Sequence, residues 1–239
     1  MSVMEAATMD RLEMHSARRY LYALGQALRG GEPTAERLAA VDDGLVAEAA
    51  AVLGLPDTTA SEFVRALAAA RADVPEACAA YTTLFIGPAA PKALAWESTY
   101  RSLSKALFRQ ETLEVRNAYR AQGFLPASYP KVADDHIALE LGFLAALAGN
   151  AAEALQAADE AGAADAVAAA SLQFLNDHLL TWIDDYAADL SAAAVATTST
   201  SEAAKAPAPS VSTPVPATLY PALIHLVAAL AHRDRQLLG

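Results

Sequence analysis

Carboxylate side chains are clustered at two places in this 239-residue chain. Asp134 and Asp135 are adjacent, and a second acidic patch occupies residues 184–189. If the two patches faced each other, their oxygens could hold Mg²⁺ and a diphosphate, as in an all-α, Mg-dependent diphosphate enzyme. The alternative is that both patches are solvated helix ends, because no evident set of Lys and Arg surrounds them to hold the diphosphate.

Three polar residues lie at the start of one predicted helix. Asp135 precedes His136, and Glu140 follows one turn later. In one interpretation Asp135 is the N-cap of this helix. In the other it is a partly exposed carboxylate that accepts a bidentate guanidinium, with His136 and Glu140 beside it. His136 and Glu140 could share a metal ion, but a lone i, i+4 pair fits a surface hydrogen bond better, so we predict no metal and no cofactor.

Trp96, Ser98 and Tyr100 lie before and within another predicted helix. Trp96 fits either a core anchor after a loop or a side chain that contacts a ligand. Ser98 fits the N-cap of the helix that runs through Tyr100, and we expect Tyr100 to be half-buried with its hydroxyl near a polar group. Packing and binding therefore both remain open for these three residues.

Sequence motifs for nucleotide binding and nucleophilic catalysis are absent: there is no G-x-x-x-x-G-K-[ST], G-x-G-x-x-G or G-x-S-x-G. With 28 acidic and 17 basic residues, the net charge of −11 repels nucleic acids and anionic membranes. The sequence contains no charge-free run of about 18 apolar residues, so we predict no stable membrane insertion. The single cysteine and the lack of a secretory signal favour the cytoplasm.

Helical spacing recurs along most of the chain, and Ala, the strongest helix former, supplies much of the 54% apolar content. We predict a single-domain, all-α bundle of about ten helices. The predicted helices span residues 10–29, 34–54, 60–72, 74–86, 98–109, 110–122, 136–149, 150–160, 163–190 and 217–238.

A Pro/Ser/Thr-rich stretch at residues 191–216 has almost no large apolar side chains, so we predict a disordered linker there. The body would then comprise residues 1–190, and a C-terminal helix at 217–238 would pack on it. Because such a linker is long enough to reach a neighbouring molecule, a monomer and a swapped dimer are both compatible with the sequence.

Four blocks of the sequence together resemble the TorD/DmsD/NarJ family of redox-enzyme maturation chaperones. They are Y-x-x-L-F-x-G-P at 81–88, W-E-S-x-Y at 96–100, D-H-x-x-x-E-L-x-F-L at 135–144 and F-L-x-x-H-L-x-x-W at 174–182. Their order and approximate spacing also agree with that family. The resemblance spans nearly the whole chain apart from the predicted linker.

The resemblance implies an all-α chaperone rather than an enzyme. Such proteins bind the twin-arginine signal peptide, and often the body, of a molybdenum-cofactor oxidoreductase, and delay its export until the cofactor is inserted. By motif match, the resemblance implies a signal-peptide site, to which we add Glu140 because it lies one turn from His136. The predicted site residues are Trp96, Ser98, Tyr100, Asp135, His136 and Glu140. The Mg-dependent enzyme and a helical regulatory adaptor remain the alternatives.

Two features depart from the family pattern. The family usually has a Glu-Pro pair shortly before the Asp-His, where this chain has Val132 and Ala133. The stretch at 191–216 is also longer and richer in Pro, Ser and Thr than the family leads us to expect.

Overall fold

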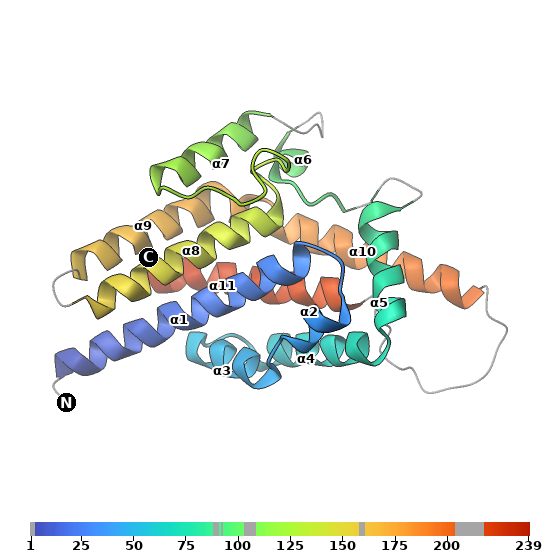
Figure 1. Ribbon diagram of the computed structural model, residues 1–239, viewed down its shortest axis with the longest axis horizontal. Helices are drawn as coiled ribbons and strands as arrows, with labels where there is room; N and C mark the ends of the chain where they lie inside the picture. The colour runs from blue at the N-terminus through green and yellow to red at the C-terminus, as the bar shows by residue number, and fades with distance from the viewer. Residues whose placement is uncertain (1–2, 88–90, 92, 103–108, 158–160, 204–217) are drawn as a thin grey trace.

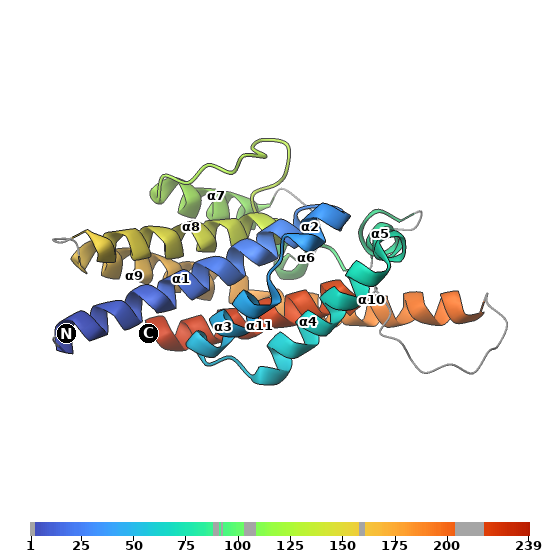
Figure 2. The ribbon, with the colours of Figure 1, turned by 60° about the horizontal axis from the view of Figure 1, so that its bottom comes forward.

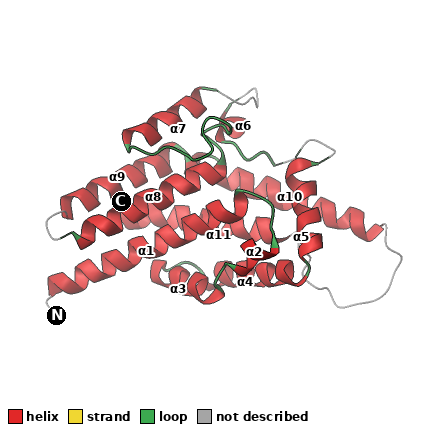
Figure 3. Cartoon of the chain, viewed as in Figure 1, coloured by secondary structure: helices red, strands yellow, loops and turns green. Residues whose placement is uncertain are grey.

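The computed structural model describes residues 3–87, 91, 93–102, 109–157, 161–203 and 218–239. Within these residues the chain forms eleven α-helices, one π-helix, one 3-10 helix and no strand (Figure 3). The α-helices are α1 (Val3–Arg29), α2 (Ala35–Ala39), α3 (Asp43–Leu53), α4 (Asp57–Ala72), α5 (Val74–Tyr81), α6 (Glu97–Arg101), α7 (Gln110–Ala121), α8 (Ile137–Gln156), α9 (Ala161–Asp177), α10 (Ile183–Ala203) and α11 (Leu219–Leu238). The all-α prediction is confirmed.

The long helices α1 and α8 pack side by side and antiparallel through the middle of the molecule (Figure 1). Gly25 of α1 allows this close approach, because a Cβ at that position would lie 2.8 Å from the Leu141 side chain of α8. The C-terminal end of α1 and the N-terminal end of α8 are therefore brought to the same end of the bundle. The predicted site residues at the start of α8 lie at this end.

The last helix, α11, packs against α1, α4, α9 and α10 of the same chain, as Figures 1 and 2 show. A buried ion pair fixes it, since Arg18 Nε of α1 donates to Asp234 Oδ2 of α11 at 2.8 Å. The Tyr22 hydroxyl donates to the same carboxylate at 2.9 Å. The C-terminal helix is therefore part of the core of this chain.

Several predicted helix boundaries are wrong for local reasons. The stretch at 34–54 forms two helices, because the Asp42 side chain accepts the backbone N–H groups of Gly44 and Leu45 and starts α3 there. The described residues of the stretch at 136–160, which are 136–157, contain one helix, α8, rather than two. A 3-10 turn at Leu179–Thr181 interrupts the helix predicted over 163–190.

Two more predicted helices are shorter than expected. In the stretch at 74–86, α5 changes into a π-helix at Thr82–Ile86, which ends at Gly87 with φ of 75°. The helix predicted over 98–109 is described only as α6, Glu97–Arg101, and residues 103–108 lie outside the described part of the chain.

The predicted start of the linker at residue 191 is also wrong. Helix α10 continues to Ala203, because the sequence after Leu190 is rich in Ala and holds no Pro before Pro207. Residues 204–216, which make up the remainder of the predicted linker, and residue 217, the predicted start of the last helix, lie outside the described residues.

Helix α8 is the one described helix long and apolar enough to cross a membrane. Most of its apolar window, 72%, is buried inside the protein. This burial is typical of the central helix of a helical bundle, so the apolar composition of α8 is explained by core packing.

Candidate functional site

A short backbone bridge joins the two sequence blocks that carry the predicted site. The N–H of Glu97 donates to the carbonyl oxygen of Asp135 at 3.0 Å, and the N–H of Ile137 donates to that of Ala95 at 2.9 Å. Trp96 and His136 thereby form an isolated antiparallel bridge. The structure thus brings together residues that lie about 40 positions apart in the chain.

Asp135 is fully buried rather than partly exposed, so the expectation of an exposed carboxylate is wrong. Its Oδ2 accepts the backbone N–H of Ser98 at 3.0 Å, in the first turn of α6. Asp135 therefore caps α6 and not α8, the helix that follows it in the sequence. Its other oxygen, Oδ1, is buried without a hydrogen-bond partner among the described residues.

His136 is the residue that caps α8. Its Nδ1 accepts the backbone N–H of Ala138 at 3.1 Å, which leaves the ring proton on Nε2. Burial, and then the positive charge of Arg29, lower the pKa of His136 to about 3, so the ring is neutral near pH 7. The ring of Trp96 packs edge-on against it at 5.1 Å between centroids.

Ser98 is likewise buried and does not cap α6 with its side chain, so that prediction is wrong. The N-cap position of α6 is occupied by Trp96, and the Ser98 hydroxyl oxygen has no partner among the described residues. Tyr100 is half-buried, as predicted, and the centroid of its ring lies 5.5 Å from the centroid of the Trp182 ring. Burial, with the nearby Asp189 carboxylate, raises the pKa of Tyr100.

Glu140 is buried in the core and accepts a hydrogen bond from Trp182 Nε1 at 3.3 Å. Burial first, and then the negative charges of Glu97 and Asp135, raise its pKa well above the usual value. The Glu140 side chain is therefore neutral over part of the pH range in which exposed carboxyls are ionised. A neutral, buried carboxyl group of this kind is suited to holding Trp182 in place.

Sequence reasoning missed a third buried carboxyl group beside this site, in addition to those of Asp135 and Glu140. The fully buried Glu97 side chain accepts a hydrogen bond from Arg101, and one of its oxygens lies 3.1 Å from His178 Nδ1. Both Glu97 and His178 belong to the sequence blocks described above, but nothing local to either block indicates that they pair. The pair joins α6 to the end of α9.

One aspartate in each acidic patch of the enzyme alternative pairs with a basic side chain of the protein. Asp134 forms a 2.6 Å ion pair with Arg116, and Asp184 forms a 2.9 Å pair with His232. Among the residues that the structure describes, no group of three or more His, Cys, Asp or Glu side chains is arranged to hold a metal ion.

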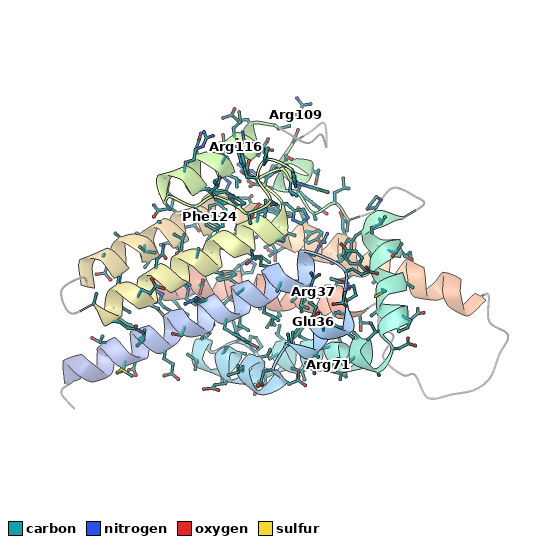
Figure 4. The ribbon with its side chains drawn as sticks, in the orientation of Figure 1. Glu36, Arg37, Arg71, Arg109, Arg116 and Phe124 are labelled. Carbon is teal, nitrogen blue, oxygen red and sulfur yellow. The ribbon has the colours of Figure 1, made fainter. Side chains whose placement is uncertain are left out.

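A groove of about 750 Å³ lies at this end of the bundle. Its walls come from the ends of α1 and α5, from α2, from Trp96 just before α6, from the loop after α7 and from the start of α8. The side chains of Phe124, Leu125 and Leu139 make much of it apolar. Figure 4 marks Arg37 on α2 and Phe124 on the loop after α7, two of the residues that line the groove.

Two of the six predicted site residues line this groove, namely Trp96 and His136. The other four do not line it, and three of these, Ser98, Asp135 and Glu140, are fully buried. The structure therefore divides the predicted set into a pair that lines the groove and four residues that do not.

Comparison with models of protein families identifies a match. The model of the family described as nitrate reductase delta subunit matches residues 54–188, which is more than half of the chain. Searches of curated proteins and of solved structures find no match. The matched range contains Trp96, His136 and the loop between α7 and α8. The chain therefore belongs to the nitrate reductase delta subunit family, the family of NarJ- and TorD-type chaperones.

Proposed function

We propose that this protein is a cytoplasmic chaperone that binds the twin-arginine leader and the apo form of a molybdopterin oxidoreductase. It assists insertion of the molybdenum cofactor and delays export until the cofactor is in place. Membership of a chaperone family supports a binding role. The groove carries the proposal, because Trp96 and His136, from two of the blocks that resemble the family, line it next to each other.

The groove suits the apolar, helix-forming middle of a leader peptide. Apolar side chains line it, and Leu125 at 72% exposure is available to cover a partner. An amphipathic helix in an apolar groove is a common mode of peptide recognition. The protein's net charge of −11 attracts the basic front of the leader and speeds the encounter.

The residues of the predicted site have different roles in this proposal. Trp96 and His136 contact the peptide. Asp135 positions them, because its cap on Ser98 and its backbone bond to Glu97 hold the segment that carries Trp96. Glu140 and Tyr100 support the same region through Trp182.

The test is titration calorimetry with a synthetic twin-arginine leader of a molybdopterin oxidoreductase from the same genome. Leu125→Ser should weaken binding by about tenfold or more, because an exposed leucine that becomes buried contributes about 1.5–3 kcal/mol. Leu113→Ser is the matched control, because Leu113 is 48% exposed on α7 and does not line the groove.

Neither variant should change the melting temperature, since both leucines are exposed. If no leader binds, the proposed function is wrong. If the Leu113→Ser and Leu125→Ser variants lose affinity equally, the leader does not occupy this groove.

A further inference from the structure

The end of the groove formed by α1 and α2 is positively charged, although the protein as a whole is acidic. Arg29 and Arg37 both line the groove, and none of its described lining residues is an Asp or a Glu. The nearest acidic residues in the sequence, Glu32 and Glu36, are exposed and do not line it. The groove therefore offers positive charge to whatever occupies it.

Arg29 is held in place by neutral groups. It is only 5% exposed, its Nε donates to the Tyr186 hydroxyl at 2.9 Å, and its guanidinium lies 3.8 Å from the centroid of the Phe85 ring. Neither contact neutralises its charge. A buried cation without an anionic partner is unfavourable, so a ligand that brings an anion gains from the pairing.

Other arginines in the described part of the chain are paired differently. Arg18, Arg71 and Arg116 each form an ion pair with an aspartate. No ion pair to Arg29 or Arg37 occurs among the described residues, and Arg37 Nη1 donates instead to the carbonyl oxygen of Glu32 at 2.8 Å. The two guanidinium groups are thus available for a carboxylate.

Most of the segments outside the described residues contain no acidic residue. Residues 1–2, 88–90, 92, 103–108 and 204–217 contain no Asp or Glu. Residues 158–160 contain Asp159 and Glu160, but they follow the far end of α8, about 30 Å along that helix from His136. The anion must therefore come from a partner.

We propose that Arg29 and Arg37 form an anion subsite that accepts the carboxylate of an acidic side chain within the apolar client segment that fills the groove. This inference rests on the proposed function for the identity of the occupant. The neighbouring His136 adds a neutral Nε2–H donor, since its Nδ1 is the acceptor that caps α8. The subsite thus favours client segments in which a Glu or Asp is flanked by apolar residues, and it disfavours segments with an arginine at that position.

The test uses two labelled peptides that consist of Ala, Leu and Ser around one central residue, which is Glu in one peptide and Gln in the other. Each peptide has about 14 residues, which is long enough to form a helix. Fluorescence anisotropy should show the Glu peptide binding about tenfold more tightly, because a charge-assisted hydrogen bond is lost with Gln. Arg37→Gln should remove this preference. Arg235→Gln, an exposed site on α11 with the same charge change, should retain it.

Arg29→Lys is a second variant that keeps the charge but loses the two-pronged geometry, and it should reduce the Glu preference without abolishing it. Equal binding of the two peptides to the unmodified protein overturns the subsite, as does a Glu preference that Arg37→Gln leaves unchanged. Inorganic phosphate is the probe for a free anion. If phosphate binds more tightly than the Glu peptide in calorimetry, the ligand is a small anion and the side-chain assignment is wrong.

The two proposals fail separately. A leader that binds in a Leu125-dependent manner while the Glu and Gln peptides bind equally overturns only the subsite. A Glu preference that depends on Arg37, without binding of any twin-arginine leader, overturns only the proposed function.

Discussion

The Asp135 carboxylate accepts a 3.0 Å hydrogen bond from the backbone N–H of Ser98, 37 positions away in the sequence. This bond caps α6 and joins the Trp96 segment to the start of α8. The sequence suggests that the Asp135 carboxylate binds a ligand. In the structure it instead joins the Trp96 segment to the start of α8, the two parts of the chain that form the candidate site.

Substitution of Asp135 separates its capping role from a direct contact with peptide. Asp135→Asn should change the unfolding free energy little, because the Asn oxygen still accepts the Ser98 N–H. Asp135→Ala should cost about 1–3 kcal/mol, since it leaves that buried N–H without a partner. Urea unfolding measures both variants.

Calorimetry of Asp135→Asn with the leader peptide tests whether the Asp135 carboxylate is buried or contacts the leader. Because Asp135 is fully buried, Asp135→Asn should leave leader affinity within about twofold of the unmodified protein. A loss of tenfold or more, reduced when a leader Arg is replaced by Lys, would show that the carboxylate turns outward and binds a guanidinium.

Glu140 should make the protein less stable as the pH rises. Its pKa is raised in the folded state, so the folded protein binds a proton that the unfolded chain releases above about pH 4.3. The contribution of Glu140 to the free energy of unfolding is therefore fully present below about pH 4.3. As the pH rises from there to the raised pKa, this contribution falls by up to about 1.4 kcal/mol per pH unit. Glu140→Gln should remove this loss and keep the acceptor for Trp182.

Urea unfolding of Glu140→Gln and the unmodified protein at pH 5 and pH 8 measures the effect. The stability of the variant relative to the unmodified protein should increase with pH. Glu153→Gln, at an exposed position of the same helix, should show no such trend. A constant difference between Glu140→Gln and the unmodified protein would mean that Glu140 is ionised in the folded state.

The sequence predicts the helices well because helix formation depends on local spacing and on Ala content. It predicts the partner of Asp135 poorly, since an aspartate before a helix is equally suited to capping that helix or a distant one. Glu97 and His178 show the same difficulty, because their 3.1 Å contact depends on how α6 and α9 pack. The groove itself is composed of side chains from six parts of the chain, namely the ends of α1 and α5, helix α2, the residue before α6, the loop after α7 and the start of α8. No local pattern marks Arg29 or Arg37 as part of it.

Asp234 should be important for the stability of the fold. Asp234→Asn breaks the fully buried pair with Arg18 and should cost about 3–5 kcal/mol, because the remaining guanidinium is buried without its counter-charge. Asp184→Asn is the control, since it breaks the pair with His232 at a carboxylate that is 63% exposed and should change stability little. Equal small effects in urea unfolding would show that α11 is not fixed by the Arg18–Asp234 pair.

His136 should make the protein less stable in mild acid. Its pKa is lowered to about 3 in the folded state, whereas an unfolded histidine titrates near 6.5. Between these values the unfolded chain binds the proton and the folded protein does not, so stability falls as the pH drops below about 6.5. From pH 7 to pH 5 the expected loss from this residue is roughly 1–2 kcal/mol.

His136→Asn should remove this part of the acid sensitivity, because Asn retains a side-chain acceptor for the Ala138 N–H but does not titrate. The measurement is the unfolding free energy in urea at pH 7 and pH 5 for both proteins. His15, whose pKa is lowered to about 4 by burial and by Arg18, contributes a similar loss. The informative quantity is therefore the difference between the two proteins, in which the His15 contribution cancels. A variant that loses as much stability as the unmodified protein between these pH values would show that His136 takes up a proton in the folded state and that its ring is open to water.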